Sequence, residues 1–325
     1  SGTHGKTTTS YMLAHIFLDQ GIEIGYLVGG ISENFENSAC LGKDSIFVIE
    51  ADEYDSAFFD KRSKFIHYSP SNLIINNIEF DHADIFDDIE DIKKQFHHLI
   101  KIIKPSGNII YFNNDLNTTE VIERGIWCNK IGINSSNIKI NFKSRELVID
   151  NEIFSLADLP LIGEHNFKNY VCSILAAKLE NISVTESINS LKKFKGVKRR
   201  MDFITEIRGV RIYDDFAHHP TAIKLSCDAI RNKYSGKKIL GIIELASNTM
   251  SSGFHKENLI KSMDLLDEFL LLDVNKNYKI NNSFDSEKNL IKNIKEKISE
   301  YDIILIMTNK DSQKFINPII KIIEK

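Results

Sequence analysis

The chain has 325 residues and a formal net charge of -4, with 42% hydrophobic and 26% charged residues. This balance excludes intrinsic disorder, which combines low hydrophobicity with high net charge. It also gives no basic excess that would drive binding to nucleic acid or to a membrane surface. The four cysteines are scattered and form no CxxC pair, which is typical of a protein in a reducing cytoplasm.

Apolar segments alternate with helical patterns along most of the chain, which predicts an α/β fold with a mostly parallel sheet. In chain order, we expect a helix at 7–20, strands at 45–50 and 73–76, a helix at 89–104, a strand at 108–112, short antiparallel strands within 126–156, helices at 167–179 and 184–194, strands at 211–214, 238–243, 268–272 and 303–307, and a helix at 313–323. A domain boundary is predicted near Lys195–Gly196.

The chain begins with a glycine-rich sequence, residues 2–7 (GTHGKT), directly before the first predicted helix. This matches the second half of a P-loop, in which backbone N–H groups and a helix N-terminus bind phosphate oxygens. Lys6 would reach the β- and γ-phosphates, and the Thr7 hydroxyl would bind Mg²⁺. The first glycine of the GxxxxGK[ST] motif would stand one position before Ser1, so we expect further sequence before this chain. The alternative is a chance GKT sequence in a loop.

Acidic and polar residues follow two of the predicted strands. The strand at 45–50 ends in a run of acids, of which Glu50 is nearest to the strand. An acid at the end of a neighbouring strand helps to hold Mg²⁺ in P-loop proteins. His82 follows the strand at 73–76, at the edge where open α/β sheets bind ligands, and a neutral imidazole can bind a metal ion. A solvated acidic turn and a structural histidine are the alternatives.

Several ordered segments together resemble the Mur ligase family. They are GTHGKTTTS (2–10), EADEYDSAFFDKRSKFIHYSP (50–70), NNIEFDHADIF (76–86), GEHNFKNY (163–170), GVKRRMD (196–202), YDDFAHHPTAI (213–223) and ASNTM (246–250). Residues 57–68 resemble the branch of the family that acts in cell-wall recycling. The resemblance implies a central P-loop ATPase domain with a mostly parallel sheet, residues 1–195, truncated at its N-terminus. It also implies a C-terminal Rossmann-like α/β domain, residues 196–325.

The resemblance implies roles for individual residues, by their positions in the matching segments. The implied catalytic residues are Lys6, His82 and Arg200, and the implied Mg²⁺ ligands are Thr7, Glu50 and His82. The implied ATP-binding residues are Gly2, Thr3, His4, Gly5, Lys6, Thr7, Thr8, His165, Asn166, Asn169, Arg200, Asp215 and His218. Among them, the asparagines would contact adenine, whose N6–H and N7 suit a carboxamide, and Asp215 would bind the ribose. An ordinary helix N-terminus and a structural His-His-Pro turn remain as alternatives.

The implied reaction is ATP-dependent amide formation, in which UDP-N-acetylmuramate is activated as an acyl phosphate and joined to L-Ala-γ-D-Glu-meso-diaminopimelate. We expect a monomeric cytoplasmic enzyme of peptidoglycan recycling, with no nucleic-acid or membrane partner, and no ligated product from this chain alone. Two departures from the family pattern, Ala246 and residues 308–312, leave alternatives open. These are a ligase for free L-alanine, an ATP-binding Mur-like protein without ligase activity, and a general P-loop ATPase. Residues 247–250 and Lys310 are candidates for the peptide-binding surface.

Overall fold

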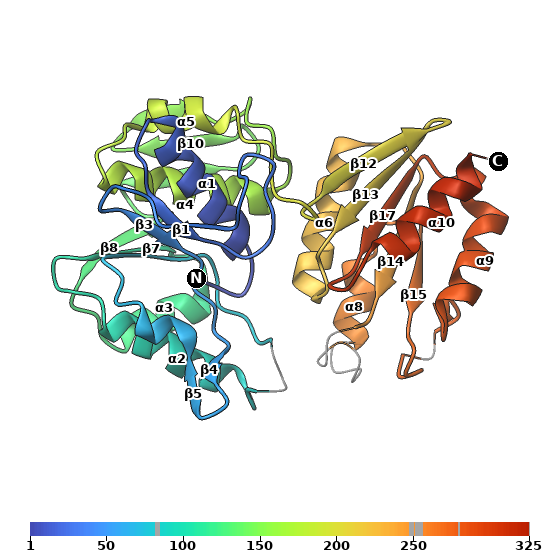
Figure 1. The fold of residues 1–325 in the computed structure, drawn as a ribbon, viewed down its shortest axis with the longest axis horizontal. Coiled ribbons are helices and arrows are strands. Elements are labelled where there is room, and N and C mark those ends of the chain that lie inside the picture. The colour runs from blue at the N-terminus through green and yellow to red at the C-terminus, as the bar shows by residue number, and fades with distance from the viewer. Residues whose placement is uncertain (82–84, 247–249, 251–255, 279, 325) are drawn as a thin grey trace. The chain divides into compact units, whose positions relative to one another are not determined.

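The computed structural model describes residues 1–81, 85–246, 250, 256–278 and 280–324 (Figure 1). The chain divides into two compact units, Ser1–Val197 and Lys198–Lys325. The predicted boundary at residues 195 and 196 lies two residues before this division. No helix within the described ranges combines the length and apolar character needed to cross a membrane.

The first unit combines short sheets with five α-helices and a short 3-10 helix (Lys64–His67) in its described residues. Its elements are α1 (Lys6–Asp19), β1 (Gly25–Leu27), β2 (Ala39–Cys40), β3 (Phe47–Ile49), β4 (Asp55–Ala57), β5 (Asp60–Ser63), β6 (Asn72–Ile75), α2 (Ile89–Lys101), β7 (Asn108–Phe112), α3 (Leu116–Glu123), β8 (Asn129–Ile133), β9 (Ile138–Asn141), β10 (Glu146–Ile149), β11 (Glu152–Ser155), α4 (Glu164–Leu179) and α5 (Val184–Leu191).

Parallel pairing dominates near the phosphate loop. Strands β6, β7 and β8 pair in parallel, and β1 pairs in parallel with β3. Strands β9, β10 and β11 form an antiparallel sheet, as expected for this region. The expectation of antiparallel strands throughout 126–156 is wrong for β8, because α3 carries the chain back across the sheet and such a crossover produces a parallel pair.

Helices α1 and α4 are buried against each other in the core of the first unit. The side chains of Tyr11, Met12 and Phe17 on α1 are almost fully buried, as is that of Tyr170 on α4. A helix that is apolar on most of its surface belongs in the interior. This packing fixes the N-terminus of α1, where the predicted phosphate loop lies, beside Asn169 in the second turn of α4.

The second unit is a single six-stranded sheet with helices on both faces. Its elements are β12 (Asp202–Ile207), β13 (Val210–Asp215), α6 (Pro220–Lys233), β14 (Ile239–Glu244), α8 (Lys256–Ser262), β15 (Glu268–Leu272), β16 (Ser283–Phe284), α9 (Glu287–Lys297), β17 (Ile303–Met307) and α10 (Gln313–Ile323). The strand order is β12-β13-β17-β14-β15-β16, and only the edge strand β12 is antiparallel to its neighbour.

Two apolar clusters sandwich this sheet. Residues of α6 and α8 pack on one face, including Ile223 and Leu259, while residues of α9 and α10 pack on the other, including Leu290 and Phe315 (Figure 1). Strands β14 and β17 are buried along their whole length, as expected for parallel strands covered on both sides. The predicted Rossmann-like architecture is therefore confirmed for this unit.

Candidate nucleotide-binding site

The loop before α1 has a backbone conformation that only glycine adopts without strain. Gly5 is the N-cap of α1 with a φ of 83°, in the left-handed region. A Cβ atom at Gly5 would lie 2.5 Å from both Asn169 Oδ1 and Asn76 Nδ2. Within the described residues no side chain caps α1, so the N–H groups of its first turn, which includes the buried Thr8, are oriented to bind phosphate oxygens.

The first residues of the chain are held against the end of β6. The N–H group of Thr3 donates to Asn77 O at 3.1 Å, and the N–H group of His4 donates to Asn77 Oδ1 at 2.8 Å. At Gly2, where φ is 128°, a Cβ atom would lie 2.9 Å from Asn77 O. No role was predicted for Asn76 or Asn77, although two consecutive asparagines directly follow an apolar strand.

The threonine and the glutamate predicted to hold Mg²⁺ lie together. Thr7 Oγ1 donates a hydrogen bond to Glu50 Oε1 at 2.8 Å, and Gly29 N–H donates to Glu50 Oε2 at 2.7 Å. Hydroxyl and carboxylate oxygens are the ligands that Mg²⁺ prefers, so the chemistry of this pair fits that ion. His82, the third predicted ligand, lies outside the described residues.

Lys6 is paired with a buried carboxylate. Its Nζ atom donates to Glu53 Oε2 at 3.0 Å and to Glu53 Oε1 at 3.2 Å, and lies 3.7 Å from Asp52 Oδ1. Burial disfavours the charged lysine, but the carboxylates of Glu53 and Asp52 outweigh that effect and raise the pKa of Lys6. Lys6 is therefore a cation at neutral pH. The sequence showed these acids but not their pairing with Lys6.

The two predicted adenine-binding asparagines lie on α4, and one of them, Asn169, contacts α1. Asn169 Oδ1 accepts a hydrogen bond from Thr9 Oγ1 at 3.1 Å, and Asn166 Nδ2 donates to Ile162 O at 2.8 Å. Both asparagines are buried, whereas His165 is half-buried. The Asn169 contact ties α4 to α1, and the contact of both asparagines with adenine stays a prediction.

In the second unit, Arg200 stands on a strained loop. The residues on either side, Arg199 and Met201, have backbone φ values of 60° and 54°, which are uncommon for residues other than glycine. Asp215 holds this loop, because its Oδ2 atom accepts from Met201 N–H at 2.6 Å and its Oδ1 atom accepts from Ala217 N–H at 2.7 Å. Burial raises the pKa of Asp215. Asp215 thus organises the loop that carries Arg200, and its contact with ribose stays a prediction.

Phe216 lies under both arginines. The guanidinium carbon of Arg200 is 4.8 Å from the centre of the Phe216 ring, and that of Arg199 is 5.2 Å from it. Arg199 Nε also donates to the buried Asp214 at 3.2 Å. His218 packs edge-on against Phe216, with Nδ1 2.9 Å from Phe216 O. No role was predicted for Phe216, although it stands within the segment YDDFAHHPTAI.

The segment that departs from the family pattern, residues 308–312, has its own hydrogen bonds. Thr308 Oγ1 donates to Glu244 Oε2 at 2.5 Å and accepts from Lys310 N–H at 3.0 Å. Lys314 Nζ lies 2.6 Å from Glu244 Oε1. Ala246 is half-buried, Met250 is buried, and residues 247–249 lie outside the described residues. The segment 308–312 therefore takes part in a connected polar network at the carboxyl ends of β14 and β17.

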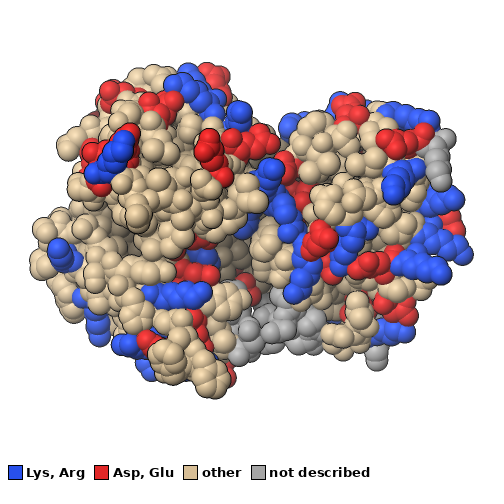
Figure 2. Space-filling view, viewed as in Figure 1, with Lys and Arg blue, Asp and Glu red and all other residues tan. Residues whose placement is uncertain are grey.

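Charges of both signs are interspersed on the face of each unit that Figure 2 shows. We therefore expect single positive side chains at the candidate site, and not a broad basic surface, to bind the phosphates. A glycine-rich loop at a helix N-terminus, a lysine in that loop and a threonine–glutamate pair beside it define a nucleotide-binding α/β protein of the P-loop class, followed by a Rossmann-like unit.

Comparison with known protein families identifies the family more specifically than the fold and the site do. Residues 1–177 match the Mur ligase middle domain, and residues 199–310 match the Mur ligase, glutamate ligase domain. The chain belongs to the Mur ligase family, which confirms the resemblance seen in its sequence.

Two curated relatives and one solved structure show where in the family the similarity is high. The UDP-N-acetylmuramate–L-alanyl-γ-D-glutamyl-meso-2,6-diaminoheptandioate ligase of Escherichia coli is 43% identical over 84% of this chain and 61% of its own length. The UDP-N-acetylmuramate–L-alanine ligase of Clostridium kluyveri is 34% identical over 84% of this chain and 60% of its own length. The murein peptide ligase of Psychrobacter arcticus is 33% identical, with a TM-score of 0.74, over 99% of this chain and 76% of that one. The chain thus spans about three fifths of the length of the curated relatives.

Proposed function

We propose that the protein containing this chain is an ATP-dependent amide ligase that joins UDP-N-acetylmuramate to L-Ala-γ-D-Glu-meso-diaminopimelate in peptidoglycan recycling. The observation that carries the proposal is the phosphate loop, where Lys6 and the Thr7–Glu50 pair lie at the N-terminus of α1. The 43% identity to a relative whose name states these substrates supports the choice of substrates.

The chain's residues suit phosphoryl transfer, which depends on positioning and on neutralising negative charge. The N–H groups of the first turn of α1 and the Lys6 ammonium group bind and orient the phosphates. Thr7 and Glu50 are the proposed ligands of Mg²⁺, which supplies charge neutralisation at the phosphate oxygens when bound. Arg200 lies against the Phe216 ring, on the loop that Asp215 holds through Met201 N–H, and is the proposed second positive charge for the transferred group.

The proposed reaction has two steps, phosphoryl transfer and amide formation. The lactyl carboxylate of UDP-N-acetylmuramate takes the γ-phosphoryl group of ATP, which leaves ADP. The free α-amine of the peptide then attacks the acyl carbon, the amide bond forms, and phosphate and a proton are released. Oriented groups make both attacks effectively unimolecular, which is the main source of rate in such a site.

We propose that the protein is a monomer located in the cytoplasm. The state of the cysteines supports the cytoplasmic location. All four are free thiols, and Cys172 and Cys227 are buried. Free buried thiols are typical of a reducing compartment.

A second candidate is the ligation of free L-alanine, because one relative with that name is 34% identical. Phosphate release by the full-length protein separates the candidates. With ATP, Mg²⁺ and UDP-N-acetylmuramate present, we expect the rate to rise when the tripeptide is added and not when L-alanine is added. The reverse result would favour the L-alanine ligase. Phosphate release without UDP-N-acetylmuramate would favour a general P-loop ATPase and contradict both.

A further inference from the structure

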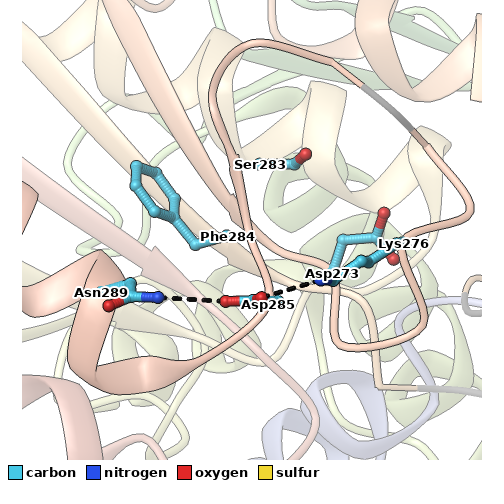
Figure 3. Close-up of a pocket in the computed structure, with 6 residues that line it drawn as sticks. All are labelled: Asp273, Lys276, Ser283, Phe284, Asp285 and Asn289. Atoms are coloured by element: carbon cyan, nitrogen blue, oxygen red, sulfur yellow. Dashed lines mark hydrogen bonds and ion pairs between the residues drawn. The ribbon is translucent and has the colours of Figure 1, made fainter.

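A pocket of about 380 Å³ lies in the second unit, at the carboxyl ends of β15 and β16, the edge at which open α/β sheets bind ligands (Figure 3). Its lining includes Lys276 and Asp285, whose exposed side chains pair at 2.9 Å. A pocket at that edge suits the substrates of the proposed reaction, so it points to no separate function. A different set of contacts, all within the first unit, holds the chain just before it enters the second unit.

The loop between β1 and β2 begins beside the phosphate site. Gly29 N–H donates to Glu50 Oε2 at 2.7 Å, and the other oxygen of that carboxylate accepts from Thr7 Oγ1. The carbonyl of Gly30 accepts from the Tyr11 hydroxyl at 3.0 Å, and a Cβ atom at Gly30, where φ is 85°, would lie 3.3 Å from Thr7 Cγ2. A ligand that fixes the Glu50 carboxylate therefore also fixes the start of this loop.

The same loop holds the linker, residues 193–197, by which the chain leaves the first unit. Ser32 Oγ donates to Gly196 O at 2.7 Å, and Ser32 pairs with Val197 in an isolated antiparallel β-bridge. Ser32 is 1% exposed and Val197 is 5% exposed, so the contact is buried. Because a broken buried hydrogen bond leaves a polar group without a partner, this contact favours one arrangement of the linker.

Asn34 binds the other half of the linker through both polar atoms of its carboxamide. Its Nδ2 atom donates to Lys193 O at 3.1 Å, and its Oδ1 atom accepts from Lys195 N–H at 2.7 Å. Arg200 follows only three positions after Val197. The contacts of the linker therefore set the point from which the chain continues to the loop that carries Arg200.

The two ends of the loop are joined by a short and restrained stretch. Only two residues separate Gly29 from Ser32, and one of them, Gly30, is held by Tyr11. A ligand that restrains Gly29 thus limits the motion of Ser32 as well. When binding at one site restricts motion at another, the two sites share a coupling free energy.

We infer that the β1–β2 loop transmits occupation of the phosphate site to the linker, and that Ser32 and Asn34 are positioning residues for Arg200. Binding of ATP and Mg²⁺ at Thr7 and Glu50 slows the motion of the linker, and an ordered linker in turn favours that binding. The inference rests on the proposed function for the ligands of the phosphate site, but the coupling can be measured without ligation.

Hydrogen exchange of the full-length protein, followed by mass spectrometry with and without ATP and Mg²⁺, measures the motion of the linker. In the wild type we expect the ligands to slow exchange in peptides that cover residues 193–198. In Ser32→Ala and in Asn34→Ala, exchange there should be faster and should no longer respond to the ligands. Because coupling is reciprocal, the affinity for ATP with Mg²⁺, measured by calorimetry, should fall by about fivefold in each variant, although the substitutions remove side-chain contacts to the linker.

Ser38→Ala and Asn37→Ala are the matched controls, because both residues are exposed in the same loop. They should leave linker exchange and ATP affinity unchanged, and thermal melting confirms that all four variants fold. Linker exchange that does not respond to ATP and Mg²⁺ in the wild type would overturn the inference. Variants of Ser32 and Asn34 that melt at a lower temperature, but keep the ATP affinity and the linker response of the wild type, would overturn it too, since both residues would then only stabilise the fold.

The outcomes for the inference and for the proposed function are separate. If the full-length protein ligates the tripeptide while ATP leaves linker exchange unchanged, this inference fails and the proposed function stands. If ATP slows linker exchange and both variants abolish that response in a protein that makes no ligated product, the proposed function fails and the coupling stands.

Discussion

The Nζ atom of Lys6 lies 3.0 and 3.2 Å from the two carboxylate oxygens of Glu53, whose side chain is only 3% exposed. Two contacts to one carboxylate fix the direction of the lysine as well as its charge. The segment that follows β3 therefore does two things, because Glu50 binds Thr7 and Glu53 binds Lys6. The phosphate loop and this acidic segment form one structural unit.

Glu53→Gln should show separately how the charge of Lys6 and the orientation of Lys6 affect ATP binding and turnover. Without the carboxylate, the positive charge of Lys6 is no longer shared, so we expect tighter binding of ATP. Loss of the two contacts also lets the lysine move, so kcat should fall, by about tenfold if the orientation matters as in other charge-stabilised sites. Calorimetry and steady-state kinetics on the full-length protein measure both quantities. Weaker ATP binding with an unchanged kcat would contradict this role, and Glu36→Gln, at an exposed position, is the control.

Lys6→Ala should remove ATP turnover. The substitution deletes the cation expected at the β- and γ-phosphates, and loss of one such group typically lowers the rate by about 10²- to 10³-fold. Phosphate release by the full-length variant is the measurement, with the exposed Lys192→Ala as control. Turnover at the wild-type rate would show that the loop is not the ATP site.

Gly5→Ala should damage the phosphate loop more than backbone strain alone explains. A left-handed residue other than glycine costs about 1–2 kcal/mol, and at Gly5 the new Cβ would also lie 2.5 Å from Asn169 Oδ1. Gly21 has nearly the same φ, 80°, but a Cβ there has nothing within 4 Å. We expect Gly21→Ala to lose only the strain energy and to keep nucleotide affinity. Urea unfolding and ATP titration compare the two, and equal behaviour of the variants would contradict the steric argument.

Phe216→Leu should weaken the action of Arg200 without removing it. The ring contact at 4.8 Å orients the guanidinium group, and a cation–π contact is worth about 0.5–2 kcal/mol. We therefore expect about a tenfold lower kcat/KM for ATP, and little further loss when Phe216→Leu is added to Arg200→Ala. Fully additive losses in this double-mutant cycle would show that Phe216 acts independently of Arg200.

Asp267 should contribute stability that disappears in acid. Burial opposes its charge, but Arg231 and the Ile239 N–H group bind its Oδ2 atom at 2.6 and 2.8 Å and lower the pKa of Asp267 overall. Because the folded pKa lies below the unfolded value of about 3.9, the stabilisation is present above that value and is lost as the pH falls through the folded pKa. The side chain is 42% exposed, so the effect is less than about 1 kcal/mol.

Asp267→Asn should therefore reduce the free energy of unfolding more at pH 7 than at pH 3, as measured by urea unfolding. Asp264→Asn, at an exposed position nearby, should change neither value. An equal loss at both pH values would contradict the assignment.

Sequence patterns located the buried elements well. Strands β15 and β17 and helix α10 begin and end at the predicted residues, because continuous apolar runs or a strong helical period mark them. The β4–β5 hairpin and β16 were not predicted, since they are short and polar and their pairing depends on distant contacts. The predicted direction of β8 was wrong for a similar reason. The direction depends on the crossover through α3, and the residues of the strand itself do not indicate it.

The site shows the same division. A short motif contains Gly5, Lys6 and Thr7, so they could be found by spacing alone. The partners of these residues could not. Glu53 lies 47 positions from Lys6, and the asparagine that holds His4 lies 73 positions away, so only the fold brings them together.

The central claim is that the protein joins a peptide to UDP-N-acetylmuramate with ATP. Mass spectrometry of the products made by the full-length protein from ATP, Mg²⁺, UDP-N-acetylmuramate and L-Ala-γ-D-Glu-meso-diaminopimelate tests it most directly. We predict UDP-N-acetylmuramoyl-tripeptide together with equimolar ADP and phosphate, and no product when ATP is omitted. ADP formation without a peptide-linked product would contradict the claim.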